Sequence, residues 1–167
     1  MKTFDADLQL RWTQPNINKS VYELRDINGT SYGTLSRNSM WNYKATVDAP
    51  GARLEFDSKS TWFKYYVTVT SLGTGEEIAR LNYGVWGGVG TLTFATNGAQ
   101  YRWKSTAWGN KYAWVTLEDE LVLGFAVGGF LKPKADVYFD VADPQSTVLV
   151  FLGWYLYTLS LEGSAVS

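Results

Sequence analysis

The segment before Glu162 would have apolar residues on all of its faces if it formed a helix. No charged residue occurs between Asp143 and Glu162, and the run from Val148 to Tyr157 offers no polar face. Asp143 is a good N-cap, Pro144 suits the first helical position, and Gly163 suits the C-terminal stop. The pattern predicts one helix from Pro144 to Glu162. Because a surface helix would carry a polar stripe, we expect this helix to be enclosed by protein.

Ahead of the helix, hydrophobic and polar residues alternate in short segments that indicate β-strands. The segment from Val21 to Ser36 is predicted to form a hairpin about Asn28-Gly29. The segment from Thr91 to Lys104 is predicted to form another about Asn97-Gly98. Asn-Gly is the strongest two-residue signal for a hairpin turn.

The remaining β-type segments follow one another at close intervals, separated by Gly, Asp and Asn, so the chain is expected to be a meander of about ten to twelve strands. The further strands are expected at Met40–Val47, Ala52–Phe56, Phe63–Thr70, Glu76–Tyr83, Tyr112–Leu117, Leu121–Val127 and Ala135–Val141.

So many antiparallel strands are expected to close into a barrel, because an open sheet would leave unpaired edges and curl. A barrel of about ten to twelve strands is wider than its inward side chains can fill, since roughly eight strands is the limit for that. The sequence therefore predicts an all-β closed barrel with the C-terminal helix threaded through it. Gly153 would allow the helix to approach the wall, and Trp154, Tyr155 and Tyr157 would fill the wider parts.

Composition narrows the chemistry that the chain can perform. The 167 residues are expected to form a single domain over positions 1–167. The absence of histidine and cysteine removes Ser-His-Asp and Cys-His catalysis, disulfides and nearly every zinc site. The acidic turn Glu118-Asp119-Glu120 and the aspartates before the helix are assigned to structure. We expect no enzyme activity, no catalytic residues, no cofactor and no metal.

The terminal helix raises one membrane question. Its uncharged stretch includes the polar residues Gln145, Ser146, Thr147, Thr158 and Ser160. Trp154 and Tyr155 fall in its middle and no basic residue flanks it, so burial in the protein is favoured over a membrane span. The N-terminus has no apolar run after its lysine and does not resemble a secretory signal. We expect a cytoplasmic protein, peripheral to a membrane if it binds lipid.

The densest functional pattern is the stretch from Tyr101 to Lys111. On a strand, Arg102 and Lys104 share one face while Tyr101 and Trp103 share the other. If the aromatic pair points into the barrel, the cations point outward and could bind a phosphate or an anionic lipid headgroup. The candidate ligand-binding residues are Arg102, Lys104, Trp108, Lys111, Lys132 and Lys134.

Other interpretations of this pattern stay open or are weaker. Ordinary solvated residues on an amphipathic strand would look the same. Single-stranded nucleic acid would suit interleaved aromatic and basic residues, but the net charge of −1 and the short patch argue against it. A carbohydrate platform would use exposed tryptophans, with Trp41, Trp62, Trp86 and Trp108 as candidates. The sequence leaves the oligomeric state undetermined.

Two segments carry a family resemblance: VYELRDINGTSYGTLSR near the start and DVADPQSTVLVFLGWYLYTLSLEG at the end. A meander barrel of such hairpins around a C-terminal hydrophobic helix resembles the tubby C-terminal-like superfamily, which includes tubby proteins, phospholipid scramblases and LURP-one-related proteins. The resemblance is one of layout over about Leu8 to Gly163. It implies a non-enzymatic protein, with phosphoinositide binding in tubby and lipid association in scramblases; no site residue of those proteins carries over.

Three functional hypotheses remain at this stage. The first is a non-enzymatic module that binds anionic phospholipid or phosphoinositide headgroups at a membrane surface. The second is a structural or protein–protein interaction domain with no lipid role. The third is a calycin-like carrier of a small apolar ligand, which requires the terminal helix to lie outside the barrel.

Overall fold

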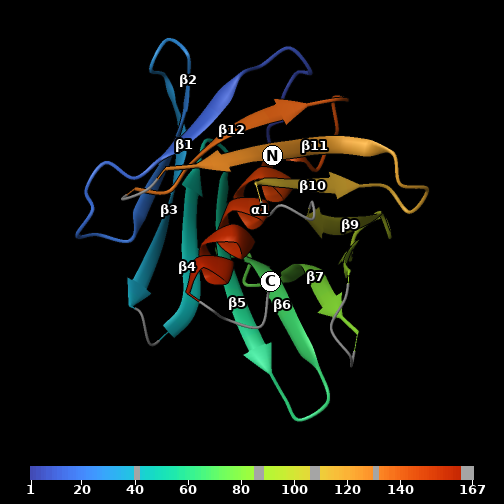
Figure 1. The fold of residues 1–167 in the computed structure, drawn as a ribbon. Coiled ribbons are helices and arrows are strands. Elements are labelled where there is room, and N and C mark those ends of the chain that lie inside the picture. Colours follow the sequence, from blue (N-terminus) through green and yellow to red (C-terminus); the bar gives the residue numbers. More distant parts are fainter. Residues whose placement is uncertain (40–41, 85–88, 106–109, 130–131, 163–167) are drawn as a thin grey trace.

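The computed structural model describes residues 1–39, 42–84, 89–105, 110–129 and 132–162. Within them, twelve antiparallel strands form one closed barrel around a single helix (Figure 1). Neighbouring strands in the sheet are consecutive in the chain, as expected for a meander. The strands are β1 (Leu10–Thr13), β2 (Val21–Asp26), β3 (Ser31–Ser39), β4 (Asn42–Ala49), β5 (Ala52–Ser60), β6 (Tyr65–Ser71), β7 (Glu77–Tyr83), β8 (Gly90–Phe94), β9 (Gln100–Ser105), β10 (Lys111–Val115), β11 (Leu121–Gly128) and β12 (Lys134–Phe139).

The short strand β1 closes the barrel, and the sequence pattern did not single it out. Its residue Trp12 lies opposite Leu24 of β2 and Ala135 of β12, so the first and last parts of the meander are joined through it. Leu10 and Trp12 point inward and are buried, while Arg11 is exposed. Closure leaves the sheet without a free edge strand that could pair with another chain.

Both predicted Asn-Gly hairpins are confirmed. Gly29 between β2 and β3 has φ +83°, and Gly98 between β8 and β9 has φ +70°, a left-handed conformation that favours glycine. The Asp26 carboxylate accepts hydrogen bonds from the backbone N–H groups of Asn28 and Thr30, both at 2.9 Å. These bonds join residues within the turn and do not depend on contacts with distant parts of the chain.

The helix α1 (Ser146–Leu161) runs through the barrel, and residues 146–159 are all buried (Figure 1). It begins two residues later than the pattern predicts. The Asp143 carboxylate accepts a hydrogen bond from the Gln145 N–H (2.7 Å), so residues 143–145 form a turn that precedes the first helical turn. The predicted stop at Gly163 lies outside the described residues.

Aromatic rings fill the space between the helix and the wall. Trp154 stacks on Trp12 at a centroid distance of 5.3 Å and an interplanar angle of 6°. On the other sides, Tyr155 packs on Phe56 at 5.4 Å and Tyr157 on Tyr112 at 5.4 Å. The predicted role of these three helical aromatics is therefore confirmed. The lumen is occupied by protein, so the condition for a carrier of an apolar ligand is not met.

Gly153 permits the close approach of helix and wall. A Cβ atom at this position would lie 2.6 Å from the Phe125 ring and 3.0 Å from the Trp103 ring. Such distances are shorter than van der Waals contact, so no larger residue fits without displacing the wall. Near the same level, the Trp114 indole N–H donates to the Leu149 carbonyl oxygen at 2.7 Å.

The two ends of the helix are tied to different parts of the chain. At its start, the backbone N–H of Phe4 donates to Ser146 Oγ (2.9 Å), and the Thr147 hydroxyl donates to the Lys2 carbonyl oxygen. At its end, Glu162 forms an ion pair with Arg37, whose side chain is only 2% exposed. A cation beside the last helical turn is favourable because the helix dipole is negative there.

The described part of the chain contains no helix with the length and hydrophobicity needed to cross a bilayer.

A carboxylate inside the barrel should prevent folding. We expect Leu152→Asp or Leu156→Asp to destabilise the protein by several kcal/mol, because both side chains are fully buried and a carboxylate there would lose its hydration. The measurement is soluble yield and thermal unfolding by circular dichroism. Leu161→Asp is the matched control, since Leu161 is 54% exposed at the end of the same helix. A cooperative, unshifted transition in either core variant would contradict the buried placement.

Gly153→Ala should lower stability by about 1–3 kcal/mol through overpacking against Phe125. On an unpacked helix the same change would be stabilising by roughly 1 kcal/mol, so the sign of the effect reports the contact. Urea unfolding measures it. Gly128→Ala in β11 is the control, because a Cβ atom there meets nothing within 4 Å. Stabilisation by Gly153→Ala would show that helix and wall are not in contact at this point.

Candidate functional site

The two cations predicted on one face of β9 point outward and meet a carboxylate. Lys104 Nζ lies 2.6 Å from Asp119 Oδ1, and Arg102 Nη1 lies 3.6 Å from the same oxygen. Tyr101 and Trp103, which alternate with these cations, are buried in the barrel. The alternation is therefore as predicted, but the positive charge is partly balanced by an acidic residue that the sequence analysis assigned only to a turn.

Asp119 occupies the tight turn between β10 and β11. Its backbone has φ +66°, and its N–H donates to the Thr116 carbonyl oxygen at 3.1 Å. The hydrogen bond from Lys104 is the main cause that lowers the pKa of the Asp119 carboxyl, with smaller contributions from the positive charges of Lys104 and Arg102. The carboxylate is thus ionised and paired over the neutral pH range.

The other candidate lysines are gathered at one end of the barrel. Lys111 is the first residue of β10, Lys134 is the first of β12, and Lys132 lies in the connection before β12. All three are exposed, and none forms an ion pair with a residue that the structure describes. Trp108, the remaining candidate, lies outside the described residues. The structure thus separates the five described candidates into two cations paired with Asp119 on the barrel wall and three lysines without an ion pair among the described residues.

The meander sorts the connections between strands into two sets. Because consecutive strands are antiparallel, every odd-numbered strand ends, and every even-numbered strand begins, at the end of the barrel where α1 finishes. The connections from even-numbered to odd-numbered strands, together with the segment before α1, lie at the end where α1 begins.

Charge divides between these two ends. At the end where α1 finishes, the described connections contain Lys19, Lys64 and Lys132 and no acidic residue, and Lys111 and Lys134 begin strands there; we call these five residues the lysine end. At the opposite end, the connections contain no basic residue, and their acidic residues are Glu76, Glu118, Asp119, Glu120, Asp140 and Asp143; we call these six the acidic end. In a chain of net charge −1, the fold thus places exposed lysines in the connections at one end of the barrel and acidic residues in the connections at the other.

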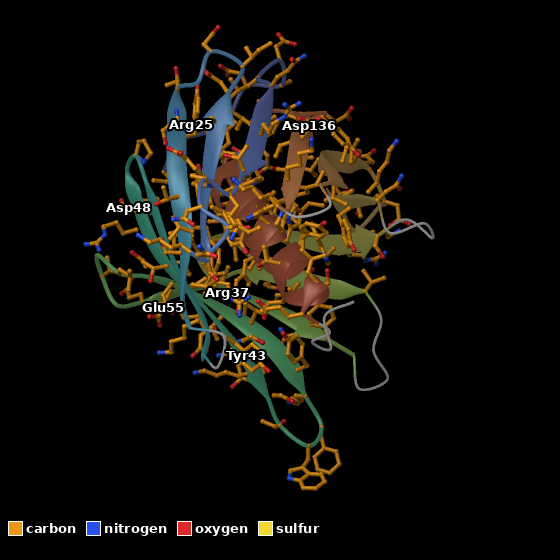
Figure 2. The ribbon with its side chains drawn as sticks, turned by 60° about the vertical axis from the view of Figure 1, so that its left-hand side comes forward. Arg25, Arg37, Tyr43, Asp48, Glu55 and Asp136 are labelled. Atoms are coloured by element: carbon orange, nitrogen blue, oxygen red, sulfur yellow. The ribbon has the colours of Figure 1, made fainter. Side chains whose placement is uncertain are left out.

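The most exposed aromatic side chains lie at the same end as the lysines. Trp62 and Phe63, in the connection between β5 and β6, are 98% and 74% exposed. This hairpin extends well beyond the rest of the barrel (Figure 2). The sequence analysis considered Trp62 for a carbohydrate platform and placed Phe63 on a strand. The strand begins instead at Tyr65, because Thr61 and Lys64 hydrogen-bond to each other and make residues 61–64 a turn.

Sequence reasoning missed Lys19, Lys64 and the Trp62-Phe63 pair as members of one surface. The signal was present in the order of the segments, since alternate connections of a meander share an end of the barrel. It requires every strand between two connections to be identified, because one omitted strand changes whether those two connections share an end of the barrel.

A hydrogen bond between Tyr101 and Asp143 helps to position the start of the helix. The Tyr101 hydroxyl donates to both Asp143 carboxylate oxygens at 2.9 Å, and burial, with a further contribution from Asp143, raises the pKa of that hydroxyl. This contact holds the turn that leads into α1. No group of three or more acidic side chains in the described ranges is arranged to hold a metal ion.

Two surface depressions lie away from the lysine end. One of about 340 Å³ is bordered by Arg11, Asp26 and Asp136, and Arg11 pairs with Asp136 at 2.6 Å across it. A shallower one of about 580 Å³ lies near Met1, Gly51 and Ile78.

Comparison with known proteins supports the fold. No family model and no curated protein sequence matches the chain. An X-ray structure of a protein from Arabidopsis thaliana is similar, with a TM-score of 0.55 over 90% of this chain and 92% of that chain. The sequence identity is 12%, so the similarity concerns the fold alone.

The ion pairs of Lys104 and Arg102 with Asp119 can be tested by titration. We expect the Asp119 carboxyl to titrate below its ordinary pKa of 3.8, and Lys104→Met to raise that pKa toward the ordinary value. Arg102→Met should raise it less, because Arg102 is the more distant cation. Carboxyl ¹³C chemical shifts followed against pH give both values. Since the folded-state pKa is the lower one, the contribution of Asp119 to stability is present above the unfolded pKa and is lost as pH falls through the folded pKa. An equal effect of the two substitutions would contradict the geometry.

Proposed function

We propose that the protein is a non-enzymatic binding module that attaches to anionic phospholipid surfaces through its lysine end. The observation that carries this proposal is the separation of charge and exposed aromatic residues between the two ends of the barrel. An anionic surface attracts the lysine end and repels the acidic end, so the electrostatic field orients the protein as well as attracting it.

The expected attachment is weak and reversible. A cation near an anionic bilayer contributes on the order of 1 kcal/mol, and the lysine end contains Lys19, Lys64, Lys111, Lys132 and Lys134. Electrostatic attraction of this size is screened within about 8 Å at physiological ionic strength. The wall pair Arg102 and Lys104 adds less than two free cations would, because Asp119 balances part of its charge.

A non-enzymatic role is supported by the amino-acid composition and by the structural contacts of two buried polar side chains. Catalysis by histidine or cysteine is impossible for this sequence. The buried hydroxyl of Tyr101 and the buried guanidinium of Arg37 are engaged in holding α1 at its two ends. A barrel whose lumen is filled by its own helix offers ligands only its outer surface.

We also propose a relationship to the tubby C-terminal-like superfamily. The support is architectural: twelve strands in a closed barrel surround a buried C-terminal helix, as the resemblance of the two terminal segments implies. Lipid association in that superfamily agrees with the proposed attachment. The alternative function, docking of a protein partner without lipid, is separated by the experiment below.

Flotation with phosphatidylcholine vesicles that contain phosphatidylserine should recover the protein at low ionic strength and release it at high ionic strength. Replacing Lys64, Lys132 and Lys134 by Ser should weaken binding on the order of a hundredfold, since three contributions of about 1 kcal/mol are lost. The thermal unfolding midpoint should stay nearly unchanged, because all three side chains are exposed.

Two matched sets of substitutions locate the surface. The control variant replaces Lys2, Arg53 and Arg80 by Ser. It loses the same number of positive charges, but at positions outside the lysine end, so binding should be almost unaltered. A second variant replaces Arg102, Lys104 and Lys111 by Ser and tests the patch expected from the sequence. Any loss of vesicle binding in this variant should arise mainly from Lys111. Failure of the parent protein to float with any anionic vesicle would reject the lipid proposal in favour of protein docking.

A further inference from the structure

We propose that the tip of the β5–β6 hairpin inserts into the interfacial layer of the bilayer, with Trp62 and Phe63 as the inserted side chains. This inference rests on the proposed function and adds to it a specific contact and an orientation. The anionic surface supplies the attraction, and the two rings supply a short-range hydrophobic contact that charge alone does not provide.

The two rings have no role in the fold. Trp62 is 98% exposed and Phe63 is 74% exposed, the largest aromatic exposures in the described part of the chain. The barrel core is complete without them, since its buried cluster contains neither residue. Leaving two large rings in water is unfavourable, and a second environment that accepts them would recover that free energy.

Hydrogen bonds order the backbone of the turn that carries the two rings. The Thr61 N–H donates to the Lys64 carbonyl oxygen at 2.7 Å, and the Lys64 N–H donates to Thr61 Oγ1 at 3.1 Å. Strand pairing reaches the base of the turn, where Ser60 lies opposite Tyr65. Because the turn is already ordered, binding through the tip does not require the backbone to lose further conformational freedom.

Cations surround the base of the tip. Lys64 adjoins Phe63 and is exposed, and Lys59 extends from β5, where it lies 3.6 Å from Asp57 with half of its side chain exposed. Aromatic side chains favour the headgroup region of a bilayer, and long lysine side chains can reach phosphate groups while their stems lie against apolar surface. The tip therefore combines both kinds of group within one turn.

The shape of the tip favours a bilayer over a protein partner. A specific protein interface buries about 800 Å² on each partner and includes a packed core with about ten hydrogen bonds. A two-residue turn that protrudes beyond the barrel presents a small convex surface instead (Figure 2). A soft interface can surround such a projection without complementary shape, and the other lysines of the same end would then face the same membrane plane.

A single fluorescent label tests insertion directly. The chain has no cysteine, so Phe63→Cys can carry one environment-sensitive nitrobenzoxadiazole group with no background. Thr96→Cys, in the turn between β8 and β9 at the acidic end, is the matched control. On phosphatidylserine-containing vesicles, the label at 63 should shift its emission to the blue and be quenched by doxyl-labelled lipid, while the label at 96 should do neither.

The affinity of the unlabelled protein gives a second measurement. Trp62→Ser with Phe63→Ser should weaken vesicle binding by about ten- to hundredfold while leaving the unfolding midpoint unchanged. Ile27→Ser is the control, since Ile27 is 82% exposed at the opposite end of the barrel.

The outcomes separate the two proposals. Vesicle binding by the parent with an aqueous label at 63 and no loss in the double variant would overturn insertion while leaving the proposed function intact. No vesicle binding by the parent would overturn both. Equal binding to vesicles of phosphatidylcholine alone would overturn the electrostatic part of the proposed function but support insertion if the label at 63 still shifts.

Discussion

A helix without a polar face must be shielded from water, and in this structure the barrel wall shields it. Residues 146–159 are all buried, so the wall must enclose roughly 10 Å of helix together with its own inward side chains. Eight strands would leave no such space, whereas twelve do. Gly153 and the ring pairs such as Trp12 with Trp154 then adjust the wall to the helix locally. Strand number, closure and core composition follow from one packing demand.

Filling the lumen moves any binding function to the outer surface. In an empty barrel the interior would be the natural ligand site, but here the interior holds Trp154, Tyr155 and the rest of the helix. The segment containing Lys2 and Phe4 attaches to the start of the helix. The connections at the other end are left to carry lysines and the Trp62-Phe63 turn. The arrangement of the helix thus bears directly on where the proposed membrane contact lies.

The candidate site shows which features of a surface can be predicted from the alternation of residues along a strand. Alternation placed Arg102 and Lys104 on the outer face, because the period of two is a local property of the backbone. Their partner Asp119 could not be foreseen, since it lies on a different turn and reaches them only through the pairing of β9 with β10. The exposure of Trp62 was equally open, because a tryptophan in a turn can fold over the sheet or point away from it.

Local patterns were sufficient to predict most of the elements and the closure of the sheet, including the uniformly apolar segment before Glu162 and the Asn-Gly turns at Gly29 and Gly98. These are consequences of local propensity and periodicity, which act within a few residues. The tertiary structure alone decided that Arg11 and Trp12 belong to the closing strand, that Asp119 pairs with the wall cations, and that the lysines share one end. Such facts depend on strand parity and register, which relate residues far apart in the chain and change together if a single strand is gained or lost.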